Sequence, residues 1–325
     1  MTQTAVTLTS VEGLAVGHRT REERPTGCTV IVAPDGATAG ASVRGAAPGT
    51  REIALLDPAS TVQQVHAITL SGGSAFGLAS ADGVIRRLRE TGIGFEIPGG
   101  PVPIVPAAIL FDLNVGEGAT APTAEDGYAA AREASTDPVQ QGCIGAGAGA
   151  TIGKLGFGRP MKGGIGTAGY RFDDGTVIAA LVATNGLGDI RDPHTGQIVA
   201  GALADDDSFV DTEARFLAGD RPGKASGEGQ NTTIGVVASN RTLTKVQCHR
   251  LAALAHDGLA RAVVPAHTRL DGDTFFFLAT NKGPAVDDAE FGRIDTAVAA
   301  AVSDAILSAV RHATSVAGYT AARDL

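Results

Sequence analysis

Apolar residues recur at every fourth position near the C-terminal end of the chain. Between residues 288 and 316 they fall on one helical face, at Ile294, Val298, Val302, Ile306 and Val310. A stripe with this spacing is typical of a helix that packs on a sheet. A further helix is predicted near 242–262. Apolar, β-branched runs at 232–239 and 273–280 flank that helix, and each has the length of a buried strand.

The N-terminal half of the chain shows strand and helix patterns in turn. Residues 28–45 predict two strands around a Pro-Asp-Gly turn. Residues 67–92 predict a strand, a Gly-Ser turn and a helix, with Ser74 as the cap of that helix and Gly92 at its end. Thr123 is expected to cap another helix.

The middle of the chain is rich in glycine and then polar. Glycines recur at short intervals through residues 142–168, and the apolar run at 176–185 predicts a buried strand. Residues 186–231 contain many Asp, Gly and Pro, so we expect an exposed linker that proteases can reach. Because strands and helices come in blocks, the pattern predicts a layered α+β fold and not a doubly wound sheet.

Composition and charge narrow the possible partners. Aromatic residues make up only 4% of the chain while glycine reaches 44 residues, so packing must rely on small side chains. The net charge of −9 argues against a nucleic-acid or anionic-membrane partner, because such a partner needs a basic face. The most apolar long stretch contains Asp295 and Asp304, which argues against a membrane span.

The N-terminus and the cysteines indicate the compartment. The first residues lack a basic segment followed by an apolar core, so no signal peptide is predicted. The three widely spaced cysteines, Cys28, Cys143 and Cys248, form no zinc or redox motif. We therefore expect reduced thiols in a cytoplasmic protein.

The glycines at 145–154 have some features of a phosphate-binding loop. A P-loop needs Ser or Thr after its Gly-Lys pair, whereas Leu155 follows Lys154, and Ala148 occupies the first glycine position. The glycines also fit the looser dinucleotide-binding pattern, but the acidic residue that this pattern requires about 20 residues further on is missing. Glycines that allow tight strand packing are the favoured interpretation, and a nucleotide site is the alternative.

The segment SGGSAFG resembles a nucleophile elbow, but Phe76 replaces the second glycine that the elbow requires. The N–H groups of Gly72, Gly73 and Ser74 are nevertheless candidates for an anion or oxyanion site at a helix N-terminus.

Other polar residues give weaker signals. His249 and His256 could share a helix face, but no carboxylate partner accompanies them, so we predict no metal centre. Asp271 and Asp273 would point to the same side of a strand, although an Asp-Gly pair is also common in turns.

An abrupt change of character occurs between Asn231 and Thr232. Polar, glycine-spaced residues end there and an apolar strand pattern begins. The junction is either a loop that enters a sheet or a peptide bond that is cleaved to make Thr232 a catalytic N-terminus. The local signals together indicate a soluble α+β enzyme and favour a hydrolase.

Seven motifs, taken in order, resemble one known family. They are VGHRT, TGCTVIVAPDGATAGASVRGAAPGTRE, LSGGSAFGLASADGV, VPIVPAAILFDL, VATNGLGD, NTTIGVVASN and DGDTFFFLATN. This order is similar to that of the L-aminopeptidase/D-esterases, a family that includes the β-peptidyl aminopeptidases and the 6-aminohexanoate-oligomer (nylon-oligomer) hydrolases. The resemblance implies a four-layer αββα sandwich, like that of N-terminal-nucleophile hydrolases but differently connected.

The resemblance also implies self-processing. A single-domain precursor, residues 1–325, would cleave itself between Asn231 and Thr232 into a large subunit, 1–231, and a small subunit, 232–325. Tetramers of such pairs are expected. The substrates would be small peptides, amides or esters, and no cofactor is implied.

The family resemblance assigns roles to five residues. Thr232 would supply the nucleophilic hydroxyl and, once cleaved, an α-amino base. Asp271 and Asp273 would orient these groups and relay protons. Lys154 would stabilise negative charge or hold a carboxylate, and Asn185 would donate a hydrogen bond to the oxyanion.

Two features qualify the substrate expectation. The Asp-x-Asp pattern is closer to the nylon-oligomer hydrolases than to the β-peptide-cleaving members, which have Ser and Glu there. Phe111 stands where we expect a tyrosine in the nylon-oligomer hydrolases, so a ring is kept but a hydroxyl is lost. The alternative function is that of an unprocessed family member that binds a small ligand or acts as a scaffold.

Overall fold

The computed structural model describes residues 5–21, 23–118, 120–223 and 231–325 of the chain. Its main strands form one hydrogen-bonded ladder in the order β3-β5-β4-β2-β14-β12-β9-β8, with β1 paired to β2. The strands are β1 Ala15–Thr20, β2 Gly27–Val43, β3 Thr50–Arg51, β4 Gln64–Ser71, β5 Ala107–Ile109, β8 Gly164–Arg171, β9 Val177–Thr184, β12 Ile234–Ser239 and β14 Thr274–Ala279.

Shorter strands and the helices complete the structure. The short strands are β6 Thr151–Ile152, β7 Met161–Lys162, β10 Asp189–Arg191, β11 Ile198–Ala200 and β13 Val263–Val264. The α-helices are α1 Ser80–Glu90, α2 Ala124–Arg132, α3 Thr212–Leu217, α4 Lys245–Ala262 and α5 Asp288–His312. The 3₁₀ turns are η1 Leu8–Ser10, η2 Ile53–Leu56, η3 Ser74–Ala79, η4 Gly145–Gly147 and η5 Ala322–Asp324.

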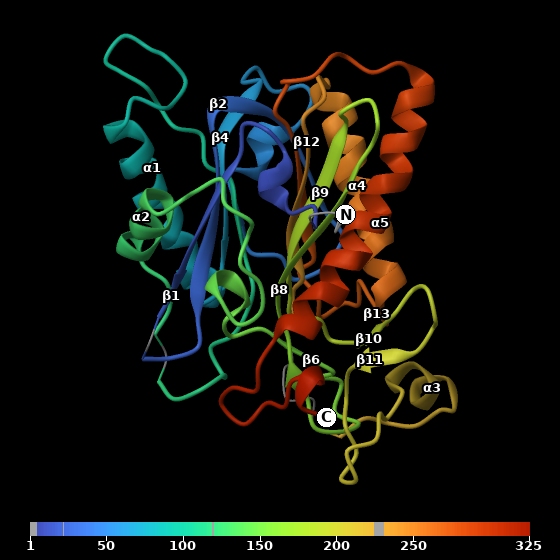
Figure 1. The fold of residues 1–325 in the computed structure, drawn as a ribbon. Helices are drawn as coiled ribbons and strands as arrows, with labels where there is room; N and C mark the ends of the chain where they lie inside the picture. The colour runs from blue at the N-terminus through green and yellow to red at the C-terminus, as the bar shows by residue number, and fades with distance from the viewer. Residues whose placement is uncertain (1–4, 22, 119, 224–230) are drawn as a thin grey trace.

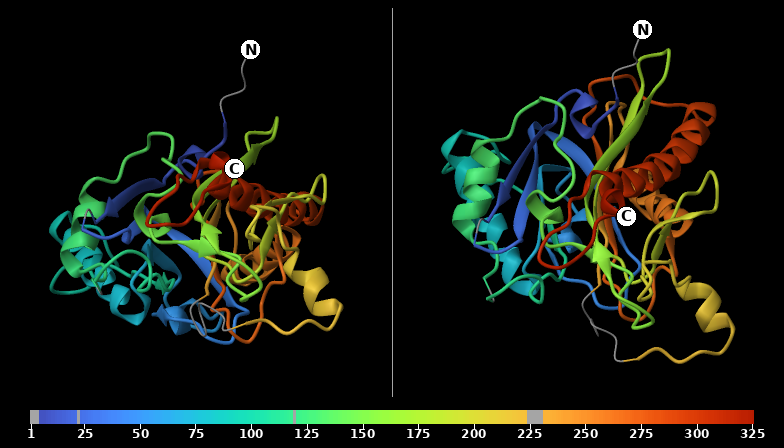
Figure 2. Two further views of the ribbon diagram at one scale, coloured as in Figure 1. Left: turned by 90° about the horizontal axis from the view of Figure 1, so that it is seen from below. Right: turned by 60° about the horizontal axis from the view of Figure 1, so that its bottom comes forward.

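Two helix pairs enclose the strands from opposite sides. Figure 1 shows α1 and α2 on one side of the strands and α4 and α5 on the other, and Figure 2 shows the same separation from below. Successive residues of β12 and β14 point to different sides: Val236 and Phe276 belong to a central apolar cluster, whereas Val237 and Phe277 pack with α4 and α5.

A third apolar cluster lies under α1 and α2. It joins Val84 and Leu88 of α1 to Cys28 and Val30 of β2, while the next residue, Ile31, faces the central cluster. The single ladder thus forms two β layers with the central cluster between them. The other two clusters separate these layers from α1 and α2 on one side and from α4 and α5 on the other, which gives four layers in the order α, β, β, α. The four-layer sandwich expected from the family resemblance is therefore confirmed.

Strand β2 takes part in both sheet layers, which corrects the prediction of two strands in residues 28–45. It is one element whose pairing with β4 shifts register between Val32 and Ala37. Pro34 and Asp35 are exposed at this irregularity. The Pro-Asp-Gly signal therefore produces a bulge inside one long strand, because β4 and then β14 continue the ladder beyond it.

The helix predictions hold well. All five residues of the apolar stripe in α5 are buried, and the Thr123 side chain forms a capping box with Asp126 at the start of α2. Among the described residues, no helix is both long enough and apolar enough to cross a membrane.

Ser74 does not cap α1 as predicted. It has a left-handed backbone with a φ of 54° and begins the 3₁₀ turn η3, and α1 begins only at Ser80. The Ser74 N–H donates to the carbonyl oxygen of Leu110 at 3.0 Å. The Gly-Ser turn therefore ties β4 to the segment after β5 before the helix begins.

The prediction of an exposed linker was wrong for its first half. Leu187 and Ile190 are buried, and β10 pairs with both β11 and β13. The buried carboxylate of Asp189 accepts the N–H groups of Ala202 and Thr212 at 2.8 and 2.7 Å. A polar residue thus holds the segment together by satisfying its backbone donors. Residues 224–230 of the predicted linker lie outside the described residues.

Glycines let helices approach strands closely. A Cβ atom on Gly166 of β8 would lie 2.2 Å from the backbone nitrogen of Ala309 in α5. A Cβ atom on Gly40 of β2 would lie 2.3 Å from the backbone nitrogen of His249 in α4. The favoured interpretation of the glycines, close packing of the backbone, applies at these positions.

We predict that Gly166→Ala lowers the free energy of unfolding by about 1–3 kcal/mol, because α5 must move away from β8. The matched control is Gly292→Ala, within α5 itself, where an added Cβ atom has no neighbour within 4 Å. That control should be neutral or stabilising by up to about 1 kcal/mol. Urea denaturation measures both variants. Equal midpoints for Gly166→Ala and the unsubstituted chain would contradict the close contact.

Candidate active site

The ends of three strands meet at one point of the sheet. Strands β12 and β14 are parallel, with Ile234 opposite Thr274, so the residues that precede them also lie side by side. Asn231 forms a bridge with Asp271 in this extension. Strand β9 is antiparallel to β12, with Ala183 opposite Ile234, so the residues after β9 return to the same level.

The Asn231–Thr232 peptide lies in the middle of this junction. The Thr232 N–H donates to the carbonyl oxygen of Asn185 at 3.1 Å. The Thr232 hydroxyl donates to the carbonyl oxygen of Asn231 at 2.5 Å, and the Gly272 N–H donates to the same oxygen at 2.9 Å. The Asn231 carbonyl is thus polarised by two donors, and the hydroxyl lies beside it.

Gly272 was not identified from the sequence, although it lies between the two aspartates. A Cβ atom at this position would lie 2.5 Å from the carbonyl oxygen of Ala47 and 2.7 Å from the Thr232 hydroxyl oxygen. Only glycine fits between these groups without displacing them. The Asp-Gly-Asp spacing is the signal that could have indicated it.

The two aspartates are buried and differently bonded. Asp273 accepts the Thr233 N–H at Oδ1, at 2.8 Å, and approaches His267 Nδ1 with Oδ2, also at 2.8 Å. Asp271 accepts the Thr268 N–H at Oδ2, at 2.7 Å. Asp271 and Asp273 each have only 2% of their surface exposed. Both carboxylates therefore belong to the site and not to an exposed turn.

Lys154 and Asn185 form the next part of the site. The Lys154 ammonium donates to Asn185 Oδ1 at 2.9 Å and to the Asn185 carbonyl oxygen at 3.2 Å. The Thr151 N–H also donates to Asn185 Oδ1, at 2.9 Å, and Asn185 Nδ2 donates to the carbonyl oxygen of Phe111 at 3.1 Å. Phe111 thus contributes its backbone to the arrangement of Asn185.

Burial shifts two pKa values toward neutrality. It raises the pKa of Asp271 to about 6, and the nearby Asp273 carboxylate acts in the same direction. Burial lowers the pKa of Lys154 to about 7, although the carboxylates of Asp271 and Asp112 oppose this change. Both groups can therefore exchange a proton close to neutral pH.

The predicted oxyanion donors at the Gly-Ser turn are already occupied. The N–H groups of Gly72, Gly73 and Ser74 donate to Gly27 O, Asp112 Oδ1 and Leu110 O, at 2.9, 2.8 and 3.0 Å. These bonds fix the turn and hold the buried Asp112 carboxylate. In this conformation the three groups are not available to a substrate oxyanion, whereas the Gly272 N–H contacts the Asn231 carbonyl.

Alternative sites receive little support from the geometry. Lys154 lies in a loop after β6 and bonds to Asn185, unlike a P-loop lysine at the start of a helix. His249 is exposed, whereas His256 is buried and its Nε2 bonds to the Ser42 carbonyl oxygen at 3.0 Å, so the two rings have different surroundings. Within the described ranges, no group of three His, Cys, Asp or Glu residues is placed to hold a metal ion.

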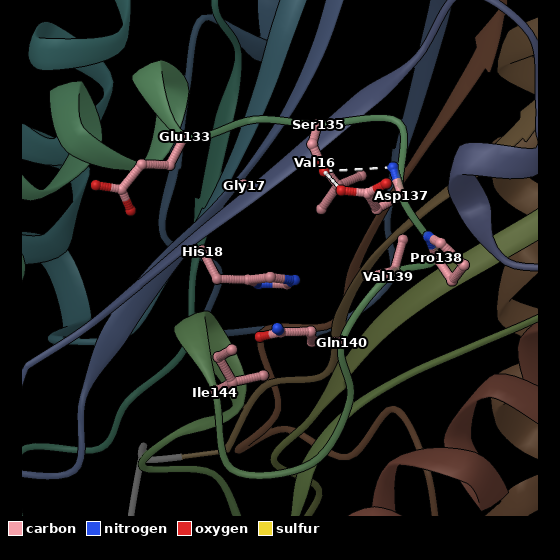
Figure 3. Close-up of a pocket in the computed structure, with 10 residues that line it drawn as sticks. All are labelled: Val16, Gly17, His18, Glu133, Ser135, Asp137, Pro138, Val139, Gln140 and Ile144. Carbon is pink, nitrogen blue, oxygen red and sulfur yellow. Dashed lines mark hydrogen bonds between the residues drawn. The ribbon is translucent and has the colours of Figure 1, made fainter.

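A separate hollow of about 250 Å³ lies beside β1 and the segment after α2 (Figure 3). It is lined in part by His18, Ser135 and Asp137. The Ser135 hydroxyl donates to Asp137 at 3.1 Å, whereas His18 Nδ1 bonds to the hydroxyl of Thr29 at 2.9 Å. Serine and histidine thus have different partners here, and the hollow lacks a nucleophile paired with its base.

Comparison with known proteins agrees with this geometry. The model of Peptidase family S58 matches residues 7–323. The chain belongs to peptidase family S58. Family S58 relatives include an uncharacterized aminopeptidase of Mycobacterium leprae, 42% identical over 96% of this chain and 91% of the relative. A 6-aminohexanoate-oligomer endohydrolase of Kocuria sp. is 31% identical over 93% of this chain and 84% of the relative.

Solved structures support the S58 fold. The β-aminopeptidase of Burkholderia sp. aligns with a TM-score of 0.72 at 22% identity, over 96% of this chain and 88% of that one. The L-aminopeptidase D-Ala-esterase/amidase of Ochrobactrum anthropi, a variant of the Ntn hydrolase fold, aligns with a TM-score of 0.67 at 20% identity, with the same coverage. The family and the relatives from Mycobacterium leprae and Kocuria identify this S58 chain as a hydrolase of peptide or amide bonds.

We predict that Asp271→Asn stabilises this S58 chain at pH 7.5 by about 2–3 kcal/mol and changes little at pH 4. The raised pKa means that the folded chain keeps a proton that the unfolded chain releases between about pH 4 and 6. Stability therefore falls as the pH rises through this range, and the asparagine removes that loss.

Urea denaturation at the two pH values measures this effect. The Asp271→Asn chain and the chain that keeps Asp271 should both carry Thr232→Ala, so that the comparison does not depend on whether the Asn231–Thr232 bond is intact. A gain in stability that is equal at pH 4 and pH 7.5 would show that the carboxyl proton is not its cause.

Proposed function

We propose that this S58 member is a self-processing amide hydrolase with Thr232 as its N-terminal nucleophile. The observation that carries the proposal is the arrangement around one carbonyl. The Thr232 hydroxyl lies 2.5 Å from the Asn231 carbonyl oxygen, and the Gly272 N–H donates to the same oxygen at 2.9 Å. A nucleophile and an oxyanion donor therefore converge on one peptide bond.

Cleavage would proceed in two steps. The Thr232 Oγ attacks the Asn231 carbonyl carbon, its proton passes to a nearby base, and the oxyanion that forms is stabilised by the Gly272 N–H. The intermediate then expels the Thr232 nitrogen, which takes up a proton, and Asn231 becomes esterified to Oγ. Water hydrolyses this ester to give an Asn231 carboxylate, a free hydroxyl and a free α-amino group.

The mature site would use the same groups on a substrate. A free α-amino group has a reference pKa of about 7.7–8.0, so it can accept the hydroxyl proton near neutral pH. Lys154 and Asp271 supply further proton exchange in this range. The substrate carbonyl would occupy the position of the Asn231 carbonyl, where the Gly272 N–H again faces the developing oxyanion.

The substrate class we propose is a small peptide or linear amide. Relatives named as aminopeptidases and as 6-aminohexanoate-oligomer endohydrolases support this class. Phe111 offers no side-chain hydroxyl, so any hydrogen bond that a tyrosine would give to a nylon-type oligomer is missing. We therefore place small peptides ahead of such oligomers.

We predict that Thr232→Ala leaves a single chain near 32.7 kDa without amidase activity, because the nucleophile is gone. Thr232→Ser is the matched control: it keeps the hydroxyl, and it should yield two fragments and retain activity. A denaturing gel shows the fragments, and N-terminal sequencing should place residue 232 first in the smaller one.

Two results would contradict the proposal. One is cleavage of Thr232→Ala at the same bond, which would identify another nucleophile or an external protease. The other is an unsubstituted chain that stays intact after long incubation and turns over no small amide, which would favour an unprocessed binding protein.

A further inference from the structure

His267 makes a contact with the aspartate pair that the proposed chemistry has not used. It lies between β13 and β14, and its Nδ1 is 2.8 Å from Asp273 Oδ2. The other oxygen of Asp273 accepts the Thr233 N–H at 2.8 Å. With Asp273 ionised, His267 Nδ1 is the donor of this contact, because a carboxylate can only accept. Asp273 is therefore contacted at both of its oxygens, by a backbone N–H and by a ring nitrogen.

The backbone at His267 serves both carboxylates. Its φ of 54° is left-handed, which is uncommon for a residue with a side chain. The next residue, Thr268, donates its N–H to Asp271 Oδ2 at 2.7 Å. One turn thus directs a side-chain donor to Asp273 and a backbone donor to Asp271.

The groups that face His267 do not compete for the contact. His256 of α4 packs against its ring edge to face, with centroids 4.8 Å apart, and donates from Nε2 to the Ser42 carbonyl oxygen at 3.0 Å. Burial lowers the pKa of His256 to about 4, so this ring is neutral. Asp273 is thus the acceptor of the His267 hydrogen.

The two aspartates cannot both be charged at low cost. They are two residues apart in a buried site, and a negative charge on Asp273 favours a proton on Asp271. Asp271 accepts the Thr268 N–H and also bonds to the Thr268 hydroxyl, whereas Asp273 accepts the Thr233 N–H and contacts His267. A hydroxyl can turn and accept a hydrogen bond from a protonated carboxyl, whereas a ring N–H can only donate, so the proton is better accommodated on Asp271.

We propose that His267 is a positioning residue that fixes the charge on Asp273 and thereby leaves the proton of the aspartate pair on Asp271. Its meaning for catalysis rests on the proposed function. The assignment of the proton does not, because it concerns only the uncleaved site.

The test compares His267→Asn with His267→Asp. Asparagine and aspartate both tolerate a left-handed backbone, and their side chains have the same shape as each other. The asparagine Nδ2 takes the place of the His267 Nδ1 and keeps an N–H donor, whereas aspartate brings a second negative charge to Asp273. Both are made with Thr232→Ala, and ¹³C NMR follows the side-chain carboxyls during a pH titration, with Asp271→Asn and Asp273→Asn for assignment.

In the chain that keeps His267, and equally in His267→Asn, Asp271 should take up its proton at a higher pH than Asp273. In His267→Asp the Asp273 midpoint should rise by about one pH unit or more, because its donor has become a like charge. An Asp273 midpoint that is the same in all three chains would overturn the proposal. So would an equal rise in both variants. Should His267→Asp fail to fold, His267→Gly removes the donor and also tolerates the backbone.

Kinetics on processed enzyme give a second readout. The acid limb of the kcat/KM profile should move to higher pH in His267→Asp, because Asp273 takes up a proton more easily in that variant. In His267→Asn the acid limb should stay in place. A chain that neither cleaves itself nor hydrolyses amides would refute the proposed function, while the carboxyl titration would still decide the role of His267.

Discussion

The site depends on one constraint, the parallel register of β12 and β14. Ile234 opposite Thr274 fixes the level at which both strands begin, and the positions of Thr232 and the aspartate pair follow from that level. A shift by one residue would turn Asp271 and Asp273 to the other face of the ladder. The antiparallel return of β9 then adds Asn185. Geometry at the junction is therefore set by backbone pairing in the centre of the sheet, where the chain is least free to adjust.

The same location explains the unusual electrostatics. Burial shifts the pKa values of Asp271 and Lys154 toward neutrality, and both changes cost stability at the pH where the groups are charged. The small side chains and close helix–strand contacts elsewhere offset this cost by dense packing. Burial of these ionisable groups thus lowers stability, whereas the packing of helices α4 and α5 on the sheet raises it.

Much of the fold could be predicted from local pattern. The apolar stripe of α5, the Thr123 cap and the strands before and after α4 are local signals, and each was found in place. The bulge in β2 could not be predicted in this way, because its Pro-Asp-Gly segment is a turn signal that neighbouring strands override. The polar segment around Asp189 was wrongly predicted to be an exposed linker, since the Asp189 carboxylate satisfies buried backbone donors.

The candidate site could likewise be predicted only in part. Resemblance of motifs indicated Thr232, Lys154, Asn185 and the two aspartates, and the structure brings them together. His267 escaped notice because its contact depends on a turn that no local sequence pattern expresses. Gly272 lies within the Asp-Gly-Asp spacing, but its contact with the Asn231 carbonyl becomes visible only when β12 pairs with β14.

Strands β12 and β14 have one further consequence. They lie between β2 and β9, so two central strands of the ladder follow the Asn231–Thr232 bond in the chain, while their neighbours on both sides precede it. A break at that bond would leave two polypeptides whose strands alternate in one sheet and share one hydrophobic core. Neither piece would have a complete core by itself. Dissociation would then require denaturation, and recovery from the denatured state would become a bimolecular assembly whose rate depends on protein concentration.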